Sequence, residues 1–259
     1  MNLEHLKSTI ENQTAIITLN RPEVLNSFNR KMSIELIELL DAISSDPDIR
    51  CIFLTGEGRA FCAGQDLAEA IAPGTEIADI VATQYNPIIQ RIRTIEKPFV
   101  CYVNGVAAGA GANLAIACDI TLASPSASFI QSFSNIGLVP DSGGTFFLPR
   151  MAGLQRAAAM MMLGEKISAQ KAEEYGMIYK VIHDENPIET ALQTAYKLAS
   201  MPTRALGLTK NALNRSLFSD LEKQLEAEKA LQQMAGNTQD YKEGVQAFLE
   251  KRKPVFKGL

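Results

Sequence analysis

The sequence predicts an α/β protein in which strand–loop–helix–strand crossover units surround one sheet, followed by an all-helical C-terminal portion. Two short apolar runs, CIFLTG (51–56) and FVCYVNG (99–105), each end in glycine and are typical of buried strands. A helix predicted at about 80–95 lies between these two runs, and the composition becomes helical near residue 200. Together these observations predict the α/β class.

The composition is that of an ordinary globular protein. Of 259 residues, 46% are hydrophobic and 21% are charged, and 25 Lys and Arg against 29 Asp and Glu give a net charge of −4. This balance excludes a predominantly disordered chain, and the length allows one large α/β domain or two small ones. Because the chain is mildly acidic and lacks a dense Lys/Arg block, we expect no nucleic-acid partner.

The N-terminal elements begin with a predicted hairpin, LKSTIE (6–11) and TAIITLN (14–20), around an Asn12-Gln13 turn. A helix is predicted at 30–44 because its apolar side chains share one face. These side chains are Met32, Leu36, Leu39, Leu40 and Ile43. After the first apolar strand comes the loop GEGRAFCAGQDL (56–67), and we expect the segment 67–85 to be a mobile loop.

In the second half, GVAAGAGANLAIAC (105–118) begins with closely spaced glycines and becomes helix-compatible at Asn113. DITLAS and ASF are short strand candidates, and the loop SNIGLVPDSGGTFFLPR (134–150) follows. Helices are then predicted near 153–163, 168–175, 187–200, 203–217, 219–235 and 239–251. In the last helix Tyr241, Val245 and Phe248 share a face that is more typical of oligomer or core packing than of a ligand groove.

Nothing in the sequence indicates secretion, a membrane span or a metal site. The N-terminus carries charges where a signal peptide needs an apolar core, and the weakly polar run 102–123 is interrupted by polar residues, so we expect a cytoplasmic protein with no membrane partner. The four cysteines form no CxxC pair, and only two histidines accompany them. We therefore expect reduced, packed thiols and neither a disulfide framework nor a metal.

One candidate for chemistry is GVAAGAGA (105–112). It fits neither the G-x-G-x-x-G fingerprint nor the Walker loop, so a nucleotide cofactor is not predicted. Two interpretations remain open. The glycines either allow a close-packed turn into a helix, or they expose backbone N–H groups at a helix start, where a developing oxyanion would be stabilised.

Two further loops have alternatives of the same kind. The loop 60–67, AFCAGQDL, is either a surface turn or the source of a second N–H donor beside the glycine-rich turn. In 139–144, VPDSGG, Asp141 either caps the helix that begins near Gly143 or acts as a carboxylate in an apolar loop. In the second case burial would raise its pKa and suit it to proton transfer.

Several motifs occur in order along the chain, at a spacing that is typical of one protein family. They are NRPEVLNSFN, GRAFCAGQDL, VNGVAAGAGANLAIACDI, IGLVPDSGGTFFLPR and DYKEGVQAFLEKRKPVFKG. On these motifs the chain resembles the crotonase (enoyl-CoA hydratase/isomerase) family over essentially its whole length. The resemblance implies a spiral of ββα units over 1–199 and a helical oligomerisation region over 200–259, assembled as a homotrimer or a dimer of trimers.

The resemblance also implies a substrate and its binding site. The substrate is an acyl-CoA thioester whose carbonyl oxygen lies between the backbone N–H groups of Gln65 and Ala110, and coenzyme A is part of the substrate, so no separate cofactor is expected. Hydratases of this family use two catalytic glutamates beside the α and β carbons of the substrate. At the two matching positions this sequence has Asn113 and Phe133. Neither residue can exchange a proton as required.

Asp141 matches the acidic position of the family's isomerases. The resemblance is closest to the branch that rearranges 2-(1,2-epoxy-1,2-dihydrophenyl)acetyl-CoA to an oxepin-CoA, with the shift of 3-enoyl-CoA to 2-enoyl-CoA as a companion activity. Asp141 would carry the proton in both reactions. The alternatives are a hydratase, a thioester hydrolase in which Asp141 activates water, and a non-catalytic acyl-CoA-binding subunit.

Supporting contacts are expected from residues near these motifs. We predict that Arg21 and Val24 line the coenzyme A entrance, and that Ala63, Asp66 and Leu67 lie beside the acyl group; loop packing is the alternative role. Asn113 and Phe133 would contact the substrate as well. Lys257, in the basic C-terminal segment, would meet coenzyme A phosphates from a neighbouring subunit, unless that segment is merely solvated.

Overall fold

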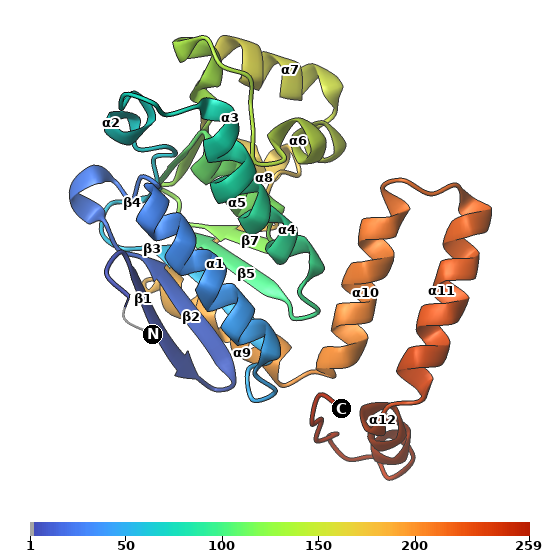
Figure 1. The fold of residues 1–259 in the computed structure, drawn as a ribbon. Helices are drawn as coiled ribbons and strands as arrows, with labels where there is room; N and C mark the ends of the chain where they lie inside the picture. Colours follow the sequence, from blue (N-terminus) through green and yellow to red (C-terminus); the bar gives the residue numbers. More distant parts are fainter. Residues whose placement is uncertain (1–2) are drawn as a thin grey trace.

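Two β-sheets form the centre of the protein in a computed structural model that describes residues 3–259 (Figure 1). The larger sheet has six strands in the order β1-β2-β3-β5-β7-β10, and all pairs except β1–β2 are parallel. Its strands are β1 (Leu6–Glu11), β2 (Thr14–Leu19), β3 (Cys51–Gly56), β5 (Phe99–Val103), β7 (Ile120–Ala123) and β10 (Lys180–Val181). The smaller sheet is β4 (Ala60–Cys62), β6 (Val106–Ala108), β8 (Ser128–Ile130) and β9 (Lys166–Ser168).

The α/β class is confirmed, whereas the prediction of a single sheet is wrong. Each long strand β3, β5 and β7 is followed by a three-residue strand, β4, β6 or β8, that joins the second sheet, so the repeating unit is ββα. Glycine makes two of these corners possible. A Cβ on Gly56 would lie 2.5 Å from the carbonyl oxygen of Phe61, and a Cβ on Gly105 would lie 2.1 Å from that of Arg59. The two sheets can therefore meet closely only at glycine.

The predicted hairpin and first helix are confirmed. Asn12 and Gln13 both have positive φ, 46° and 59°, as a two-residue type I′ turn requires. Helix α1 (Arg30–Ser45) begins after Asn29, whose side chain accepts a hydrogen bond from the N–H of Met32. All five apolar residues predicted on its inner face are buried.

Most of the other helices lie close to their predicted positions, and the short helical turns at 22–24 and 132–136 were not predicted. Besides α1, the helical elements are the 3-10 turn η1 (Pro22–Val24), α2 (Leu67–Ala70), α3 (Ile77–Ile80), the π-helix η2 (Val81–Tyr85), α4 (Asn86–Thr94), α5 (Ala110–Ala117), the 3-10 turn η3 (Ser132–Ile136), α6 (Gly144–Ala152), α7 (Leu154–Leu163), α8 (Ala169–Glu174), α9 (Pro187–Ala199), α10 (Thr203–Ser216), α11 (Leu221–Gly236) and α12 (Gln239–Leu249). Two predictions need correction. Helix α5 begins at Ala110 rather than near Asn113, and the segment 67–85 is largely helical rather than a loop, because Asp66 caps α2.

The larger sheet is buried on both faces, which explains why its strands read as continuous apolar runs. One face packs against α1, α4 and α5. The other face packs against α9 through alanines at 191, 195 and 199. The four cysteines are free and buried in these layers, as predicted for packed thiols.

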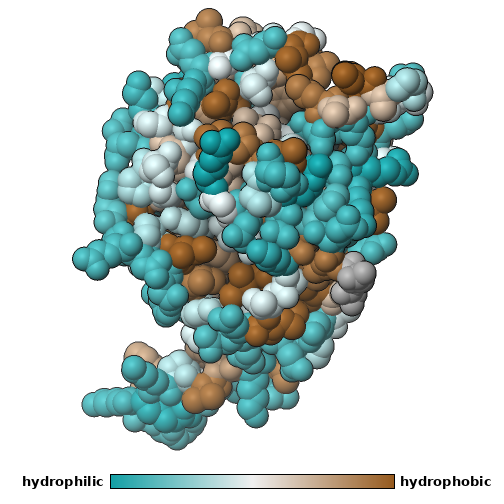
Figure 2. Space-filling view, turned by 90° about the vertical axis from the view of Figure 1, so that its left-hand side faces the viewer, coloured by the Kyte–Doolittle hydropathy of each residue, from teal (hydrophilic) through white to brown (hydrophobic). Residues whose placement is uncertain are grey.

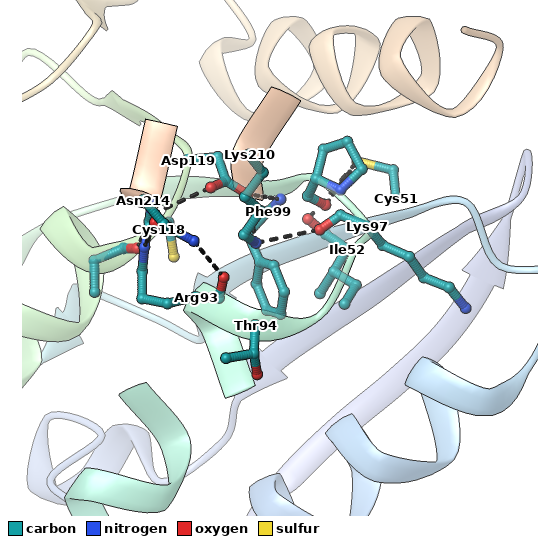
Figure 3. A network of polar contacts seen from close by, with 12 residues as sticks. Cys51, Ile52, Arg93, Thr94, Lys97, Phe99, Cys118, Asp119, Lys210 and Asn214 are labelled. Carbon is teal, nitrogen blue, oxygen red and sulfur yellow. Dashed lines mark hydrogen bonds and ion pairs between the residues drawn. The ribbon is translucent and has the colours of Figure 1, made fainter. Parts of the chain in front are cut away.

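Helices α10, α11 and α12 form an arm that projects from this core (Figure 1). A partly buried polar network joins α10 to the core (Figure 3). Asp119 lies at its centre and accepts a hydrogen bond from the backbone N–H of Phe99 at 2.9 Å. The same carboxylate pairs with Lys210 at 2.8 Å and with Arg93 at 3.2 Å. Arg93 in turn donates a hydrogen bond to Asn214, so two residues of α10 are tied to one carboxylate on the core.

The surface mixes polar and apolar side chains. Figure 2 shows hydrophobic side chains among hydrophilic ones, including at the height of α2, α3 and α7 in Figure 1. Exposed apolar residues of these elements include Leu67, Ile77, Leu154, Met162 and Leu163. Among residues 3–259 no helix combines the length and the apolar character needed to cross a membrane. Met1 and Asn2, which begin the segment where we expect no signal peptide, lie outside the described residues.

Candidate active site

A cavity of about 260 Å³ collects the loops that the sequence singled out. It lies where the ends of β4 and β6 meet the segments 67–85 and 132–141. Its lining residues are Ala63, Gly64, Gln65, Leu67, Ala70, Ile77, Ile80, Val81, Tyr85, Gly109, Ala110, Ser132, Phe133, Asn135, Ile136, Leu138 and Asp141. The cavity is therefore mainly apolar, with one carboxylate in its wall.

The first backbone N–H that can serve this cavity belongs to Gln65. The carbonyl of Gly64 accepts a hydrogen bond from Phe28 at 2.7 Å, and the N–H of Asp66 donates to Phe28 at 2.8 Å. Because successive residues of an extended segment point to opposite sides, the N–H of Gln65 points away from Phe28. It donates a hydrogen bond to no backbone group among residues 3–259. This N–H is thus available to a ligand.

The second N–H belongs to Ala110, the first residue of α5. The N–H groups of a helix's first turn have no partner inside the helix, and the positive end of the helix dipole lies there. Gly109, with φ 51°, makes the turn, and its own N–H donates to Ile130 at 2.9 Å. A Cβ on Gly64 would lie 3.6 Å from the Ala110 nitrogen. The two loops therefore lie against each other and can bind one oxygen atom between them.

Asp141 is the acidic group of the cavity. Burial raises the pKa of its carboxyl above the ordinary 3.8, and a hydrogen bond from the Ser142 hydroxyl, 2.8 Å long, opposes this increase. The carboxylate does not cap α6, because the N-cap is Gly143 and no side chain serves that helix start. Of the two roles left open for Asp141, the structure favours a partly buried carboxylate that faces the cavity.

Asn113 and Phe133 lie on either side of the cavity wall. Phe133 lines the cavity, as expected. Asn113 does not line it; its side chain is fully buried behind the wall. Its amide donates to the backbone carbonyl of Asp141 at 2.9 Å and accepts from Gln131 at 2.8 Å. The structure thus places Asn113 against the loop that carries Asp141.

The other expected contact residues divide into two groups. Ala63 and Leu67 line the cavity. Arg21 and Asp66 form an ion pair with each other at 2.9 Å, beside the partly exposed Val24 on η1. Asp66 also caps α2, so both charges already serve the local structure.

Lys257 lies far from this cavity within one chain. The C-terminal segment turns back on α12, at the opposite end of the molecule from α2 and α3 (Figure 1). The backbone N–H of Lys257 donates to the carboxylate of Asp240 at 2.7 Å, and its side chain is exposed. Contact with a ligand in the cavity would require a neighbouring chain.

Tyr85 is a cavity residue that the sequence analysis missed. It ends the π-helix η2, is almost fully buried, and donates a hydrogen bond to the side-chain oxygen of Gln65. Burial raises the pKa of its hydroxyl. The signal that could have found it is the face shared by Tyr85, Ile88 and Ile92 at i, i+3 and i+7, where one aromatic residue has a polar tip. π-helical turns occur often at functional sites.

The chain is similar to known proteins over nearly its whole length. The family model described as enoyl-CoA hydratase/isomerase matches residues 9–259. The chain is 47% identical to a 1,2-epoxyphenylacetyl-CoA isomerase from Escherichia coli, with 99% of each chain covered. It is 42% identical to a probable enoyl-CoA hydratase from Rhodobacter capsulatus, with 100% of each covered. The solved enoyl-CoA hydratase from Bacillus anthracis matches with a TM-score of 0.93 and 33% identity, covering 99% of this chain and 100% of that one.

Proposed function

The chain is an enzyme that belongs to the enoyl-CoA hydratase/isomerase family, and we propose that it isomerises acyl-CoA thioesters through an enolate, with Asp141 as the only acid–base group. The observation that carries this proposal is a single carboxylate that lines the same cavity as two backbone N–H groups with no backbone acceptor among residues 3–259. A thioester enolate needs its negative oxygen stabilised and one group that can accept and return a proton. The cavity offers both.

The residues would act in a simple sequence. The thioester oxygen accepts hydrogen bonds from the N–H groups of Gln65 and Ala110, each worth about 3–4 kcal/mol to the enolate. Asp141 takes a proton from the carbon next to the thioester, and that C–H electron pair enters the enolate. The protonated Asp141 then returns the proton to another carbon of the conjugated system, so substrate and product have the same composition. A carboxyl pKa raised by burial makes Asp141 a stronger base for this step.

The acyl group that we propose is the ring epoxide named for the Escherichia coli relative. Enolate formation would accompany rearrangement of the epoxide to the seven-membered oxepin ring. The apolar lining, from Leu67 to Leu138, suits such a ring better than a charged chain. The same machinery would shift a 3-enoyl-CoA double bond to the 2-position.

Hydration is the second candidate, because the Rhodobacter capsulatus relative is named a probable enoyl-CoA hydratase. Addition of water in this family uses two glutamates. Here Phe133 has no ionisable group, and both ends of the Asn113 amide are already hydrogen-bonded. The site therefore favours isomerisation over hydration.

Mass analysis of the products tests the proposal. The enzyme is incubated with a 3-enoyl-CoA, and then with the enzymatically prepared ring epoxide. Products of unchanged mass support isomerisation. A gain of one water identifies a hydratase, released coenzyme A identifies a thioester hydrolase, and bound but unchanged substrate identifies a binding subunit.

The N–H pair has its own test, the replacement Gly64→Ala. Gly64 has φ +95°, and a Cβ would lie 2.9 Å from the carbonyl oxygen of Ala108, so the loop must move. Because the N–H of Gln65 moves with it, we expect kcat to fall about 100-fold. The control is Gly153→Ala, which has a similar φ of +82° but nothing within 4 Å of the new Cβ. Equal kcat in the two variants, both folded by circular dichroism, would remove this loop from the chemistry.

We also propose a homotrimer or a dimer of trimers. The arm exposes apolar side chains that a soluble chain ordinarily covers. They include Phe218, Leu221, Leu225, Val245, Phe248 and Leu249. Sedimentation equilibrium would distinguish the two assemblies from a monomer.

A further inference from the structure

The segment that leads into Asp141 is exposed, although Ser142 after it is buried. Residues 134–139 are all exposed, and Ser142, next to the carboxylate, has a φ of +51° that non-glycine residues rarely adopt. A base held on such a segment needs an anchor if it is to keep a fixed distance from the oxyanion donors.

The amide of Asn113 supplies that anchor. Its nitrogen donates to the backbone carbonyl of Asp141 at 2.9 Å, and the same carbonyl accepts the N–H of Gly144 at 2.9 Å. The Asn113 side chain is 0% exposed, and its oxygen accepts from Gln131 at 2.8 Å. One side of this position thus requires a donor and the other an acceptor, and an amide provides both.

The start of α6 is shaped around this amide. A Cβ on Gly144 would lie 2.4 Å from the amide nitrogen of Asn113, so only glycine allows the approach. Asn113 itself lies in the first turn of α5, where its backbone N–H donates to Gly109 at 3.1 Å. Ala110, with the oxyanion N–H, begins the same turn.

We propose that Asn113 is a positioning residue for catalysis, which fixes Asp141 to the helix turn that carries the Ala110 N–H. The distance between base and oxyanion site is then set by α5, a buried helix, and not by the exposed loop. This inference rests on the proposed role of Asp141, but it holds for any reaction that this carboxylate performs.

The test is a double-mutant cycle between positions 113 and 141. Asn113→Leu has nearly the size of the amide, loses the donor to Asp141 and the acceptor for Gln131, and adds no second carboxyl to the site. A displacement of about 1 Å costs about 100-fold in rate, so we expect kcat to fall by about that factor while KM changes less than about threefold. In an Asp141→Asn background the same change should alter the residual kcat by less than about twofold, because no base remains to be positioned.

Two further variants keep the result interpretable. Gln131→Leu removes the other partner of the amide and should destabilise the fold similarly, while kcat falls less than about threefold. If Asn113→Leu does not fold, Asn113→Ala replaces it in the cycle. Equal losses of kcat in both backgrounds would show a merely structural role and overturn the proposal, as would an unchanged kcat in the single variant.

The cycle also separates the two proposals. Each kcat is measured for whichever reaction the wild-type enzyme performs on 3-enoyl-CoA or 2-enoyl-CoA. A wild type that hydrates its substrate overturns the isomerase proposal. The coupling between positions 113 and 141 is then measured from the kcat values for hydration. Full wild-type activity in Asp141→Asn overturns both.

Discussion

Replacement of Asp141 by Asn is expected to lower kcat for isomerisation about 10³-fold, because the amide keeps the shape of the side chain and cannot accept the proton. The rate of shift of a 3-enoyl-CoA to its 2-enoyl isomer gives the first measurement. Exchange of the α-protons for deuterium, followed by NMR, gives the second, and it isolates enolate formation from the later return of the proton.

The control for this replacement is Asp79→Asn. Asp79 is an exposed carboxylate on α3, so the change removes the same charge near the cavity and leaves its wall intact. We expect its kcat to match that of the wild type. Full activity in Asp141→Asn, or an equal loss in both variants, would contradict the single-carboxylate mechanism.

Asp141→Asn should not destabilise the protein at neutral pH. Burial raises the pKa of Asp141 in the folded state, so ionisation costs folding stability, and the cost grows as pH rises from the ordinary carboxyl pKa through the folded one. Asp141→Asn removes that cost. In urea unfolding at pH 7 the variant should be at least as stable as the wild type. The difference should vanish below about pH 3, where the carboxyl is protonated in both the folded and the unfolded wild type.

The second large effect is expected from Asp119→Ala, which breaks the network that joins the arm to the core (Figure 3). Lys210, with a side chain 7% exposed, and Arg93 would lose their shared carboxylate, and the N–H of Phe99 would lose its acceptor. Removal of one partner from a buried ion pair costs about 3–5 kcal/mol, and we expect a loss near the lower end of this range because the Arg93 and Asp119 side chains are 21% and 19% exposed. Burial lowers the pKa of Lys210 and the Asp119 charge opposes that decrease, so the lysine depends on this partner.

Urea unfolding of Asp119→Ala measures this cost. Glu226→Ala is the matched control, because it breaks the exposed Glu226–Lys229 pair, which is worth about 0–1 kcal/mol. The double replacement Asp119→Leu with Lys210→Met should recover part of the loss, since it leaves fewer buried charges unpaired. A loss below about 1 kcal/mol in Asp119→Ala would mean that water reaches and solvates the network.

The sequence predicts the helices well and the second sheet poorly, for physical reasons. Helix α1 has five apolar side chains on one face and Asn29 as its cap, and both signals are local. Strands β4 and β6 are three residues long, too short to show an alternating pattern, and their pairing depends on corners at Gly56 and Gly105. Those corners are visible only once the fold brings distant backbone atoms into contact.

The candidate site shows the same division. Turn chemistry and resemblance selected the segments of Gln65, Ala110 and Asp141, and the structure brings all three to one cavity. Tyr85 and the anchoring contact of Asn113 were not predicted, because each depends on a partner far along the chain. A fully buried amide reads in a sequence like any other asparagine until its two hydrogen bonds are seen.

The four buried cysteines can report, through their rate of chemical modification, how often the folded protein opens. Burial raises the pKa of Cys51 and of Cys62 to about 12, and it raises that of Cys101 as well. Thiol reagents attack the thiolate, so modification must wait until the sheets separate and admit solvent. The arm contains no cysteine, since the last one is Cys118. Modification of Cys62 and Cys101, which are 0% exposed, therefore reports openings of the core. Cys118 lines a cavity together with Leu206 and Lys210 of α10, so its modification also reports movements of the arm.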